Sequence, residues 1–307
     1  MNKKIVIGMV SVAIIGAVYF FGHNRATVPA SSSGKIKTAT SFYPVYFLAQ
    51  RIGGEKAEVS NITPAGAEPH DYEPTAVEMA AIENSRIVFL NGGGLETWGN
   101  DVQKTLDPKK TIVITAGNGL TNLQKDEEGE TITDPHVWLD PELMQKMADA
   151  VLGGFIAADP DNKNYYENNA AKLKSELAAL DEEYRQGFAD CAKKEIVTSH
   201  SAFGYLAARY GLKQVSVAGL SPEEEPSSQQ LAQIAEFAKS NNVKYIFFET
   251  LVSPKLSETI ANEIGAQTLE LNPIEGLDAD EAAKGGNYIT EMRKNLQNLQ
   301  IALECKR

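Results

Sequence analysis

The chain has 307 residues, 43% of them hydrophobic and 23% charged, an ordinary globular composition that excludes a disordered chain, a collagen and a coiled coil. At ~150 residues per domain, this length predicts two globular domains. The formal net charge of −12 excludes nucleic acid as a partner, because an acidic surface repels phosphate backbones. Two cysteines are too few for a cysteine zinc cluster or a disulfide-rich scaffold.

Residues 1–23 have the features of an export signal or an uncleaved signal-anchor. Lys3 and Lys4 precede an uncharged apolar run from Ile5 to Gly22, about as long as the ~20 residues that span a bilayer. We therefore expect an exported protein that is periplasmic or at the cell surface. Residues 1–23 would allow it to associate with the membrane. No cysteine follows the run, so a lipoprotein anchor is not expected. Residues 24–34 are rich in Ala, Ser, Pro and Gly and are predicted to form a flexible tether.

From residue 35 onward, short apolar runs alternate with helical patterns. The first half predicts strands at 35–40, 57–63, 86–90 and 111–115 and helices at 43–52, 75–84 and 95–106. The second half repeats the pattern, with strands at 195–199, 213–217, 243–249 and 266–271 and helices at 202–210, 228–240, 254–264 and 287–304. Strands that are apolar on both faces, with helices between them, indicate a parallel sheet in each half.

The segment 160–190 separates the two halves. It lacks Gly and Pro between positions 161 and 186 and is rich in strong helix formers, which predicts one helix of roughly 25 residues and ~38 Å. The predicted fold is α/β, with two small parallel-sheet lobes, 35–159 and 191–307, joined by a single long rigid helix. Export makes a disulfide between Cys191 and Cys305 possible, and two free buried thiols are an equal alternative.

Three histidines and one glutamate stand where strands are predicted to end or helices to begin. His70 follows the second strand, His136 directly precedes a helix, and His200 ends the strand EIVTSH. Glu275 follows the last strand of the second half. Ligands of open parallel sheets bind beyond the carboxyl ends of the strands, so we expect a metal site in the cleft between the lobes. Imidazole nitrogens with a carboxylate oxygen suit Zn²⁺ in tetrahedral geometry.

Two further features stand beside these residues. Asp71 and Asp134 lie close in sequence to the histidines and are candidates for orienting the imidazoles. The segment Asn91-Gly92-Gly93-Gly94 follows a strand, as a phosphate-binding loop would, but it lacks the Lys-Ser/Thr of a P-loop. A tight turn between strand and helix explains its glycines.

Six stretches together carry a resemblance to a known family: GAEPHDYEPT, RIVFLNGGGLETW, DPHVWLDP, VTSHSAFGYLAARYGL, EEEPSSQQLAQIAEF and VKYIFFE. They resemble the zinc-binding subfamily of substrate-binding proteins of metal ABC importers, the ZnuA- and AdcA-like proteins of cluster A-I. The resemblance runs from about residue 35 to the C-terminus. It implies two α/β lobes on a rigid helix, and His70, His136 and His200 as metal ligands.

The third histidine discriminates between metals. Manganese- and iron-binding relatives carry a glutamate where this sequence has His200, and three nitrogen ligands favour zinc. In relatives with three histidines the fourth ligand is a carboxylate from the second lobe or water. We assign it to Glu275, with Glu249 and Asp278 as the other candidates. Many zinc importers carry a long His- and Asp-rich loop before the second histidine, whereas the stretch TNLQKDEEGETITDPH predicts a shorter, solvated acidic loop.

The function expected from the sequence is an exported, monomeric receptor that captures Zn²⁺ and passes it to an ABC permease with its ATPase. It is not expected to be an enzyme. A zinc hydrolase is the rival class, because three histidines and a water form a hydrolytic site, but no HExxH motif occurs. The remaining alternatives are a manganese- or iron-binding protein of the same fold and an adhesin.

Overall fold

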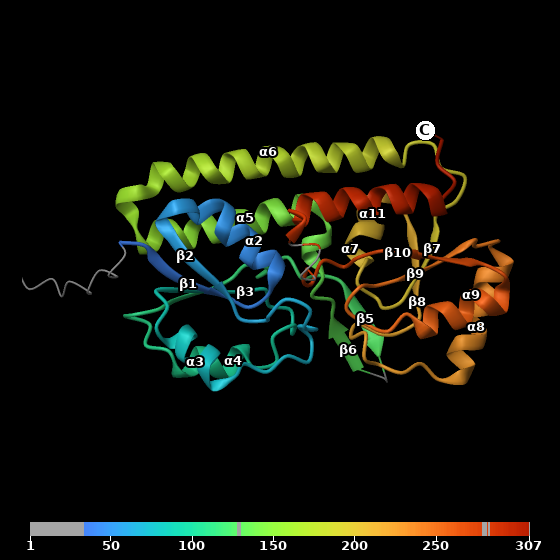
Figure 1. The fold of residues 1–307 in the computed structure, drawn as a ribbon, viewed down its shortest axis with the longest axis horizontal. Helices are drawn as coiled ribbons and strands as arrows, with labels where there is room; N and C mark the ends of the chain where they lie inside the picture. The colour runs from blue at the N-terminus through green and yellow to red at the C-terminus, as the bar shows by residue number, and fades with distance from the viewer. Residues whose placement is uncertain (1–33, 128–129, 278–280, 282, 307) are drawn as a thin grey trace, which may run out of the picture. The chain divides into compact units, whose positions relative to one another are not determined.

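The computed structural model describes residues 34–127, 130–277, 281 and 283–306 (Figure 1). The predicted export segment 1–23 lies outside these residues, as does the predicted tether 24–34 apart from Gly34. From Lys35 onward the chain forms one compact unit. None of the helices in the described ranges combines the length and the apolar composition needed to cross a bilayer.

The first lobe is built on a parallel four-stranded sheet with the order β2-β1-β3-β4. Its strands are β1 (Ile36–Thr40), β2 (Ala57–Asn61), β3 (Ile87–Leu90) and β4 (Ile112–Thr115). Its helices are α2 (Tyr43–Gly53), α3 (Ala76–Glu83), α4 (Gly99–Thr105) and α5 (Pro141–Ala158), with short 3₁₀ turns η1 (Gly54–Lys56) and η2 (Val137–Leu139).

The second lobe repeats this arrangement. Its strands are β7 (Glu195–Thr198), β8 (Lys213–Ser216), β9 (Tyr245–Phe248) and β10 (Gln267–Glu270), and its helices are α7 (Gly204–Tyr210), α8 (Ser228–Ser240), α9 (Lys255–Ile264) and α11 (Tyr288–Ala302). The sheet order is β10-β9-β7-β8, again parallel. In both lobes the first and third strands in the chain are therefore central, and the α/β prediction of two parallel sheets is confirmed.

Both sheets are buried on their two faces, as the apolar runs predicted. In β3, Ile87 and Phe89 belong to the main core, whereas Val88 and Leu90 belong to a smaller cluster under α3 and α4. Successive side chains of a strand point to opposite faces, so one short strand contributes to two cores. The strands β7 and β9 do the same between the main core and a cluster under α8 and α9.

The predicted connecting helix is α6 (Lys163–Gly187), a 25-residue helix that follows the 3₁₀ turn η3 (Pro160–Asn162). It packs on α2 and α5 of the first lobe and on α11 of the second (Figure 1). Its buried side chains recur at spacings of three and four, which keeps them on one face; they are Tyr166, Ala170, Leu173, Leu177, Leu180 and Tyr184. All six lie in the main core, which therefore continues from one lobe to the other along this helix.

Two local predictions were wrong. The helix predicted at 95–106 begins only at Gly99, because the Glu96 carboxylate accepts the backbone N–H groups of Asn91 (2.6 Å) and Gly92 (2.9 Å) in the preceding turn. The acidic stretch before His136, predicted to be a loop, forms an antiparallel hairpin of β5 (Gln124–Glu127) and β6 (Glu130–Thr133). Backbone pairing overrides the weak strand propensity of its charged residues.

The two cysteines, for which the sequence left two states open, form a disulfide. Cys191 follows α6, Cys305 follows α11, and the bridge spans 114 positions of sequence. It joins the end of the connecting helix to the end of the chain, beside an ion pair of 3.0 Å between Lys306 and Asp190.

Candidate metal centre

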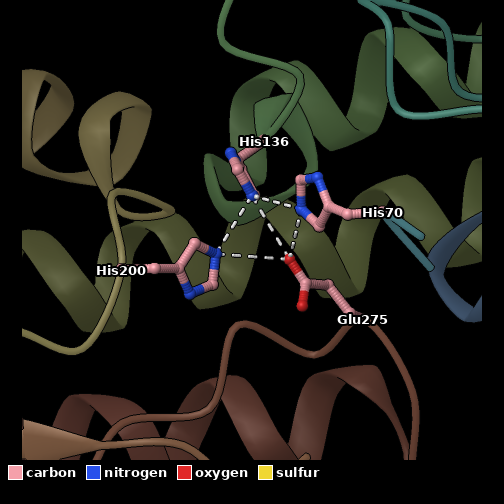
Figure 2. A group of neighbouring side chains, drawn as sticks. All are labelled: His70, His136, His200 and Glu275. Atoms are coloured by element: carbon pink, nitrogen blue, oxygen red, sulfur yellow. Dashed lines mark hydrogen bonds and ion pairs between the residues drawn. The ribbon is translucent and has the colours of Figure 1, made fainter. Parts of the chain in front are cut away.

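Four side chains from distant parts of the sequence point toward one another between the lobes (Figure 2). The Nε2 atom of His136 lies 3.2 Å from Nε2 of His70 and 3.3 Å from Nε2 of His200. The Oε1 atom of Glu275 lies 3.3 Å from His70 Nε2, 3.2 Å from His136 Nε2 and 3.5 Å from His200 Nε2. All four atoms lie within 4.8 Å of one another, so the structure brings together the complete predicted ligand set.

The five separations of 3.2 to 3.5 Å, out of six, have the size that a tetrahedral zinc site requires. Atoms at the corners of a tetrahedron with edges of about 3.3 Å surround a centre about 2.0 Å from each, and zinc bonds to histidine nitrogen and carboxylate oxygen measure ~2.0–2.2 Å. Three of the side chains are fully buried, and the His70 side chain is 10% exposed. The residues can therefore enclose one small cation with little access for water.

Strand ends explain why these residues meet. His200 lies two residues after the end of β7, and Glu275 follows β10 after a short loop. His70 lies in the connection between β2 and α3, and His136 stands between the hairpin and η2. The carboxyl ends of the parallel strands of each lobe face the cleft, which places loops from both lobes around one point.

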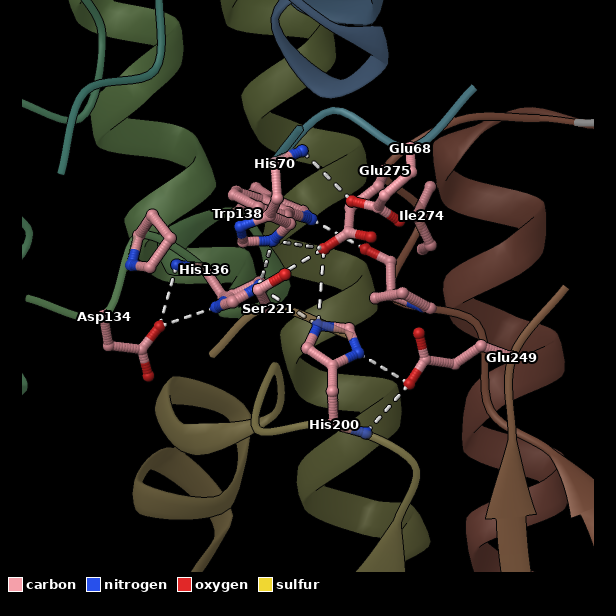
Figure 3. A network of polar contacts seen from close by, with 12 residues as sticks. Glu68, His70, Asp134, His136, Trp138, His200, Ser221, Glu249, Ile274 and Glu275 are labelled. Atoms are coloured by element: carbon pink, nitrogen blue, oxygen red, sulfur yellow. Dashed lines mark hydrogen bonds and ion pairs between the residues drawn. The ribbon is translucent and has the colours of Figure 1, made fainter. Parts of the chain in front are cut away.

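Two of the histidines are oriented by buried carboxylates (Figure 3). Asp134 Oδ1 accepts hydrogen bonds from the ring Nδ1 (2.8 Å) and the backbone N–H (2.9 Å) of His136. Glu249 Oε1 accepts from the ring Nδ1 (2.7 Å) and the backbone N–H (3.2 Å) of His200. A carboxylate on Nδ1 holds the proton there, so the Nε2 lone pair of each neutral ring is directed at the centre.

The electrostatics of the metal-free site follow from these contacts. Burial lowers the pKa of His136, but the hydrogen bonds with Asp134 and Glu275 outweigh it, and the pKa is raised above its usual value. The pKa of His200 is raised further, because Glu249 and Glu275 overcome the effect of burial. Burial raises the pKa of Glu275, but its contacts with the three imidazoles outweigh that effect and hold it well below the usual range. The carboxylate of Glu275 therefore stays ionised.

The surroundings of His70 are different. Burial lowers the pKa of its ring, and its backbone N–H donates to Glu68 Oε1 at 3.1 Å. Burial, together with the nearby charge of Glu275, raises the pKa of the Glu68 carboxyl to about 9. The connection that carries both residues, 62–75, contains neither helix nor strand.

Comparison with known proteins identifies the family. The sequence model of the family "Zinc-uptake complex component A periplasmic", ZnuA, matches residues 39–302. The chain is 40% identical over 297 residues to the high-affinity zinc uptake system protein ZnuA of Bacillus subtilis, covering 93% of both chains. The chain belongs to the ZnuA family. The family predicted from the sequence motifs is thereby confirmed.

Solved structures agree with this membership. The Zn(II)-bound ZnuA-like domain of Streptococcus pneumoniae AdcA superposes with a TM-score of 0.77 at 39% identity, over 88% of this chain and all of that domain. The whole AdcA protein is longer, and the chain covers 56% of it. The laminin-binding protein Lmb of Streptococcus agalactiae, described as a bifunctional adhesin and metal transporter, has a TM-score of 0.79 at 37% identity, covering 88% of this chain and 99% of Lmb.

In this ZnuA-family chain, some of the residues that the sequence predicted around the site contact the histidines and others do not. Asp134 orients His136 as expected, whereas Asp71 is exposed and the described hydrogen bonds of His70 lead to Glu68, His136 and Glu275. The candidate Glu249 holds the far side of a histidine ring and does not stand at the fourth corner. Asp278 lies outside the described residues. The role of Glu68 was not predicted from the sequence, although its position two residues before His70 was a signal.

The lobes are joined by hydrogen bonds and an ion pair beside the candidate ligands. The indole N–H of Trp138 donates to the Pro273 carbonyl at 2.7 Å, two residues before Glu275, and the Tyr288 hydroxyl donates to the Trp138 carbonyl at 2.5 Å. Asp140, the N-cap of α5, accepts Arg209 Nε from α7 at 2.8 Å. The segment that carries His136 is therefore fastened to the second lobe within η2 and directly after it.

A second carboxylate group lies away from this site and already has a cationic partner. Glu270, Glu281 and Glu291 come together near α11, and Lys294 Nζ lies 2.6 to 3.7 Å from their oxygens. The lysine ammonium occupies the position that a cation would take.

Proposed function

We propose that this chain captures Zn²⁺ outside the cytoplasm and delivers it to an ABC permease that works with an ATPase. The observation that carries the proposal is the set of three imidazole nitrogens and one carboxylate oxygen, which all lie within 4.8 Å of one another and of which five of the six separations are 3.2 to 3.5 Å. In this proposal His70, His136, His200 and Glu275 bind the ion. The names of the ZnuA relatives as zinc-uptake proteins support the choice of cargo.

The donor set favours zinc over manganese or iron. Nitrogen-rich tetrahedral sites suit zinc, while manganese prefers oxygen ligands and higher coordination numbers. The buried carboxylates behind His136 and His200 raise the basicity of both rings, which strengthens their bonds to a Lewis acid.

A carrier role fits the site better than catalysis. A catalytic zinc ion keeps one coordination position open for water, whereas Glu275 would fill the fourth position here. Its Oε1 atom lies within 3.5 Å of all three ligand nitrogens. We therefore infer that the protein is not an enzyme.

The remaining parts of the proposal concern the whole chain. Residues 1–23 direct export and associate the protein with the membrane without a lipid-modified cysteine, and residues 24–34 form the tether. The protein acts as a monomer, with lobes 35–159 and 191–307 joined by the segment 160–190. The basic start and the uncharged apolar run of residues 1–23 support export.

Native mass spectrometry of the full chain in mild detergent, with equal Zn²⁺ and Mn²⁺, tests the cargo. We expect one tightly held zinc per chain, and weaker zinc binding with a shift toward manganese in His200→Glu. No bound zinc, or a preference of the wild type for manganese, would overturn the proposal.

Delivery is tested in cells. Zinc accumulation in the host from which the gene has been deleted should be restored by the wild-type chain and not by His136→Ala. Restoration by both chains would contradict the proposed role of the site.

A further inference from the structure

Tyr205 lies on α7, five residues after His200, and is almost fully buried. Its hydroxyl leaves the second lobe and contacts the base of the β5–β6 hairpin of the first lobe. It accepts a hydrogen bond from the backbone N–H of Leu123 at 3.1 Å and donates one to the backbone carbonyl of Asp134 at 3.0 Å.

These two backbone groups are natural partners of each other. The hairpin pairs Gln124 with Thr133 and continues in register to Glu127 and Glu130, so the next pair outward is Leu123 with Asp134. The Asp134 N–H donates to the Leu123 carbonyl at 3.0 Å, as a ladder pair requires. In a regular antiparallel pair the Leu123 N–H would donate directly to the Asp134 carbonyl, and here the Tyr205 hydroxyl stands between them.

The start of α7 also limits the position of the Asp134 side chain. A Cβ atom placed on Gly204 would lie 2.8 Å from Asp134 Oδ2, so a side chain at position 204 would require this carboxylate oxygen to move. The other oxygen, Oδ1, accepts both hydrogen bonds from His136. The backbone and the side chain of Asp134 are thus both set by two adjacent residues of the second lobe.

We propose that Tyr205 is a positioning residue of the zinc site, acting through Asp134 on the ring of His136. Its hydroxyl, which comes from the opposite lobe, bridges the last backbone pair of the hairpin, Leu123 and Asp134. It thereby fixes the Asp134 carboxylate, which orients the His136 imidazole. Because Tyr205 follows His200 on the same segment, its hydroxyl also links the two segments that carry His136 and His200, whose Nε2 atoms are 3.3 Å apart. This inference rests on the proposed zinc function.

The test compares Tyr205→Phe with Tyr210→Phe in the full chain in mild detergent. Tyr210 is on the same helix, and its hydroxyl donates to Asp181 at 2.9 Å, so the control also loses a tyrosine hydroxyl and a hydrogen bond of α7 but leaves Asp134 untouched. Three quantities are measured: the zinc dissociation constant by competition with a chromophoric chelator, the visible absorption spectrum of bound Co²⁺, and amide exchange of the peptide that contains Leu123.

We expect Tyr205→Phe to weaken zinc binding about tenfold, the lower end of the range for groups behind a metal ligand. The Co²⁺ spectrum should change, because the His136 ring is less well oriented, and exchange at the hairpin base should speed up. Tyr210→Phe should leave all three quantities at wild-type values. A general loss of stability would not produce this difference between the two variants.

A second variant approaches Asp134 from its side chain. Gly204→Ala keeps the Tyr205 hydroxyl but forces the Asp134 carboxylate to move, so it should also weaken zinc binding and alter the Co²⁺ spectrum. If the wild type binds zinc and Tyr205→Phe matches it in affinity and spectrum, the positioning role is overturned while the proposed function stands. If the wild type binds no zinc, the proposed function fails first and this inference fails with it.

Discussion

His70 and His136 offer the same imidazole nitrogen to one site, but the chain holds them in different ways. His136 is fully buried, Asp134 accepts from both its ring and its backbone, and the following residues are bonded to the second lobe. His70 is partly exposed and lies in a connection without helix or strand, held at its backbone by Glu68. The position of His136 is therefore fixed by the packed fold, whereas the position of His70 depends on a loop.

Removing each histidine is the strongest way to break the comparison. His136→Ala should weaken zinc binding more than the ~100-fold that marks the upper end for supporting residues, because it removes a ligand and leaves the buried Asp134 without its partner. His70→Ala should cost less, since water can reach the partly exposed corner and take the fourth position.

Isothermal titration with a competing chelator measures both dissociation constants. Circular dichroism of the zinc-free variants is the control for folding. Equal losses in the two variants would contradict the asymmetry between these ligands.

The carboxylates behind the rings come next in expected effect. Asp134→Asn and Glu249→Gln should each weaken zinc binding by about 10- to 100-fold, because an amide cannot hold the imidazole proton on Nδ1 as a carboxylate does. Asp71→Asn is the matched control, an exposed aspartate next to His70, and should leave the affinity unchanged. A loss in Asp71→Asn as large as in Asp134→Asn would show that sequence proximity, and not the observed contact, decides the effect.

The zinc affinity should depend on pH, mainly through His136 and His200. The pKa values of His136 and His200 are raised in the metal-free protein, so zinc must displace protons there, and its apparent affinity should fall as the pH falls. Each displaced proton lowers the apparent binding constant about tenfold per pH unit, and the fall should begin above the ordinary histidine value of ~6.5. Chelator competition from pH 8 to 5 measures it, and an unchanged affinity over that range would exclude histidine ligation.

The stability of the zinc-free protein should depend on pH in the opposite direction to its zinc affinity. Raised histidine pKa values contribute stability that is fully present below pH ~6.5 and is lost as the pH rises through the folded-state values. Thermal unfolding of the metal-free chain should therefore show this contribution on the acidic side, where zinc binding is weakest. If this pH-dependent contribution to stability disappears in a chain carrying both His136→Ala and His200→Ala, the two histidines are its source.

The smallest effect on zinc binding is expected from the disulfide. Replacing Cys191 and Cys305 together by serine should lower the free energy of unfolding by about 2–5 kcal/mol, since the bridge closes a loop of more than 100 residues. The zinc dissociation constant should stay within about twofold, because the bridge joins the ends of α6 and α11 and no ligand is attached to either. Chemical denaturation and chelator competition separate the two quantities, and a large loss of affinity would link the chain terminus to the site.

Much of this organisation could be predicted from the sequence. The apolar runs located both parallel sheets, the absence of Gly and Pro located α6, and the ends of strands located the four residues that meet in the cleft. These features are local patterns of residue type and spacing. They need no knowledge of which side chain faces which.

What the sequence could not supply depends on direction and on long-range pairing. Glu249 ends a strand at the correct edge of the sheet, but only the three-dimensional arrangement shows that it faces Nδ1 of His200 instead of the centre. The hairpin could not be predicted, because its strands carry charges and are held by backbone bonds. The Tyr205 bridge joins residues 71 positions apart and leaves no local pattern.

The carboxylates behind the rings have a consequence for the charge that the protein must bury. Asp134, Glu249 and Glu275 place three carboxylate groups around the centre, and the raised pKa values of His136 and His200 favour protonated imidazoles there when zinc is absent. Two protons and one Zn²⁺ carry the same charge. Exchange of the ion for two protons would therefore leave the net charge of the interior unchanged, so that release of Zn²⁺ would add no further buried negative charge.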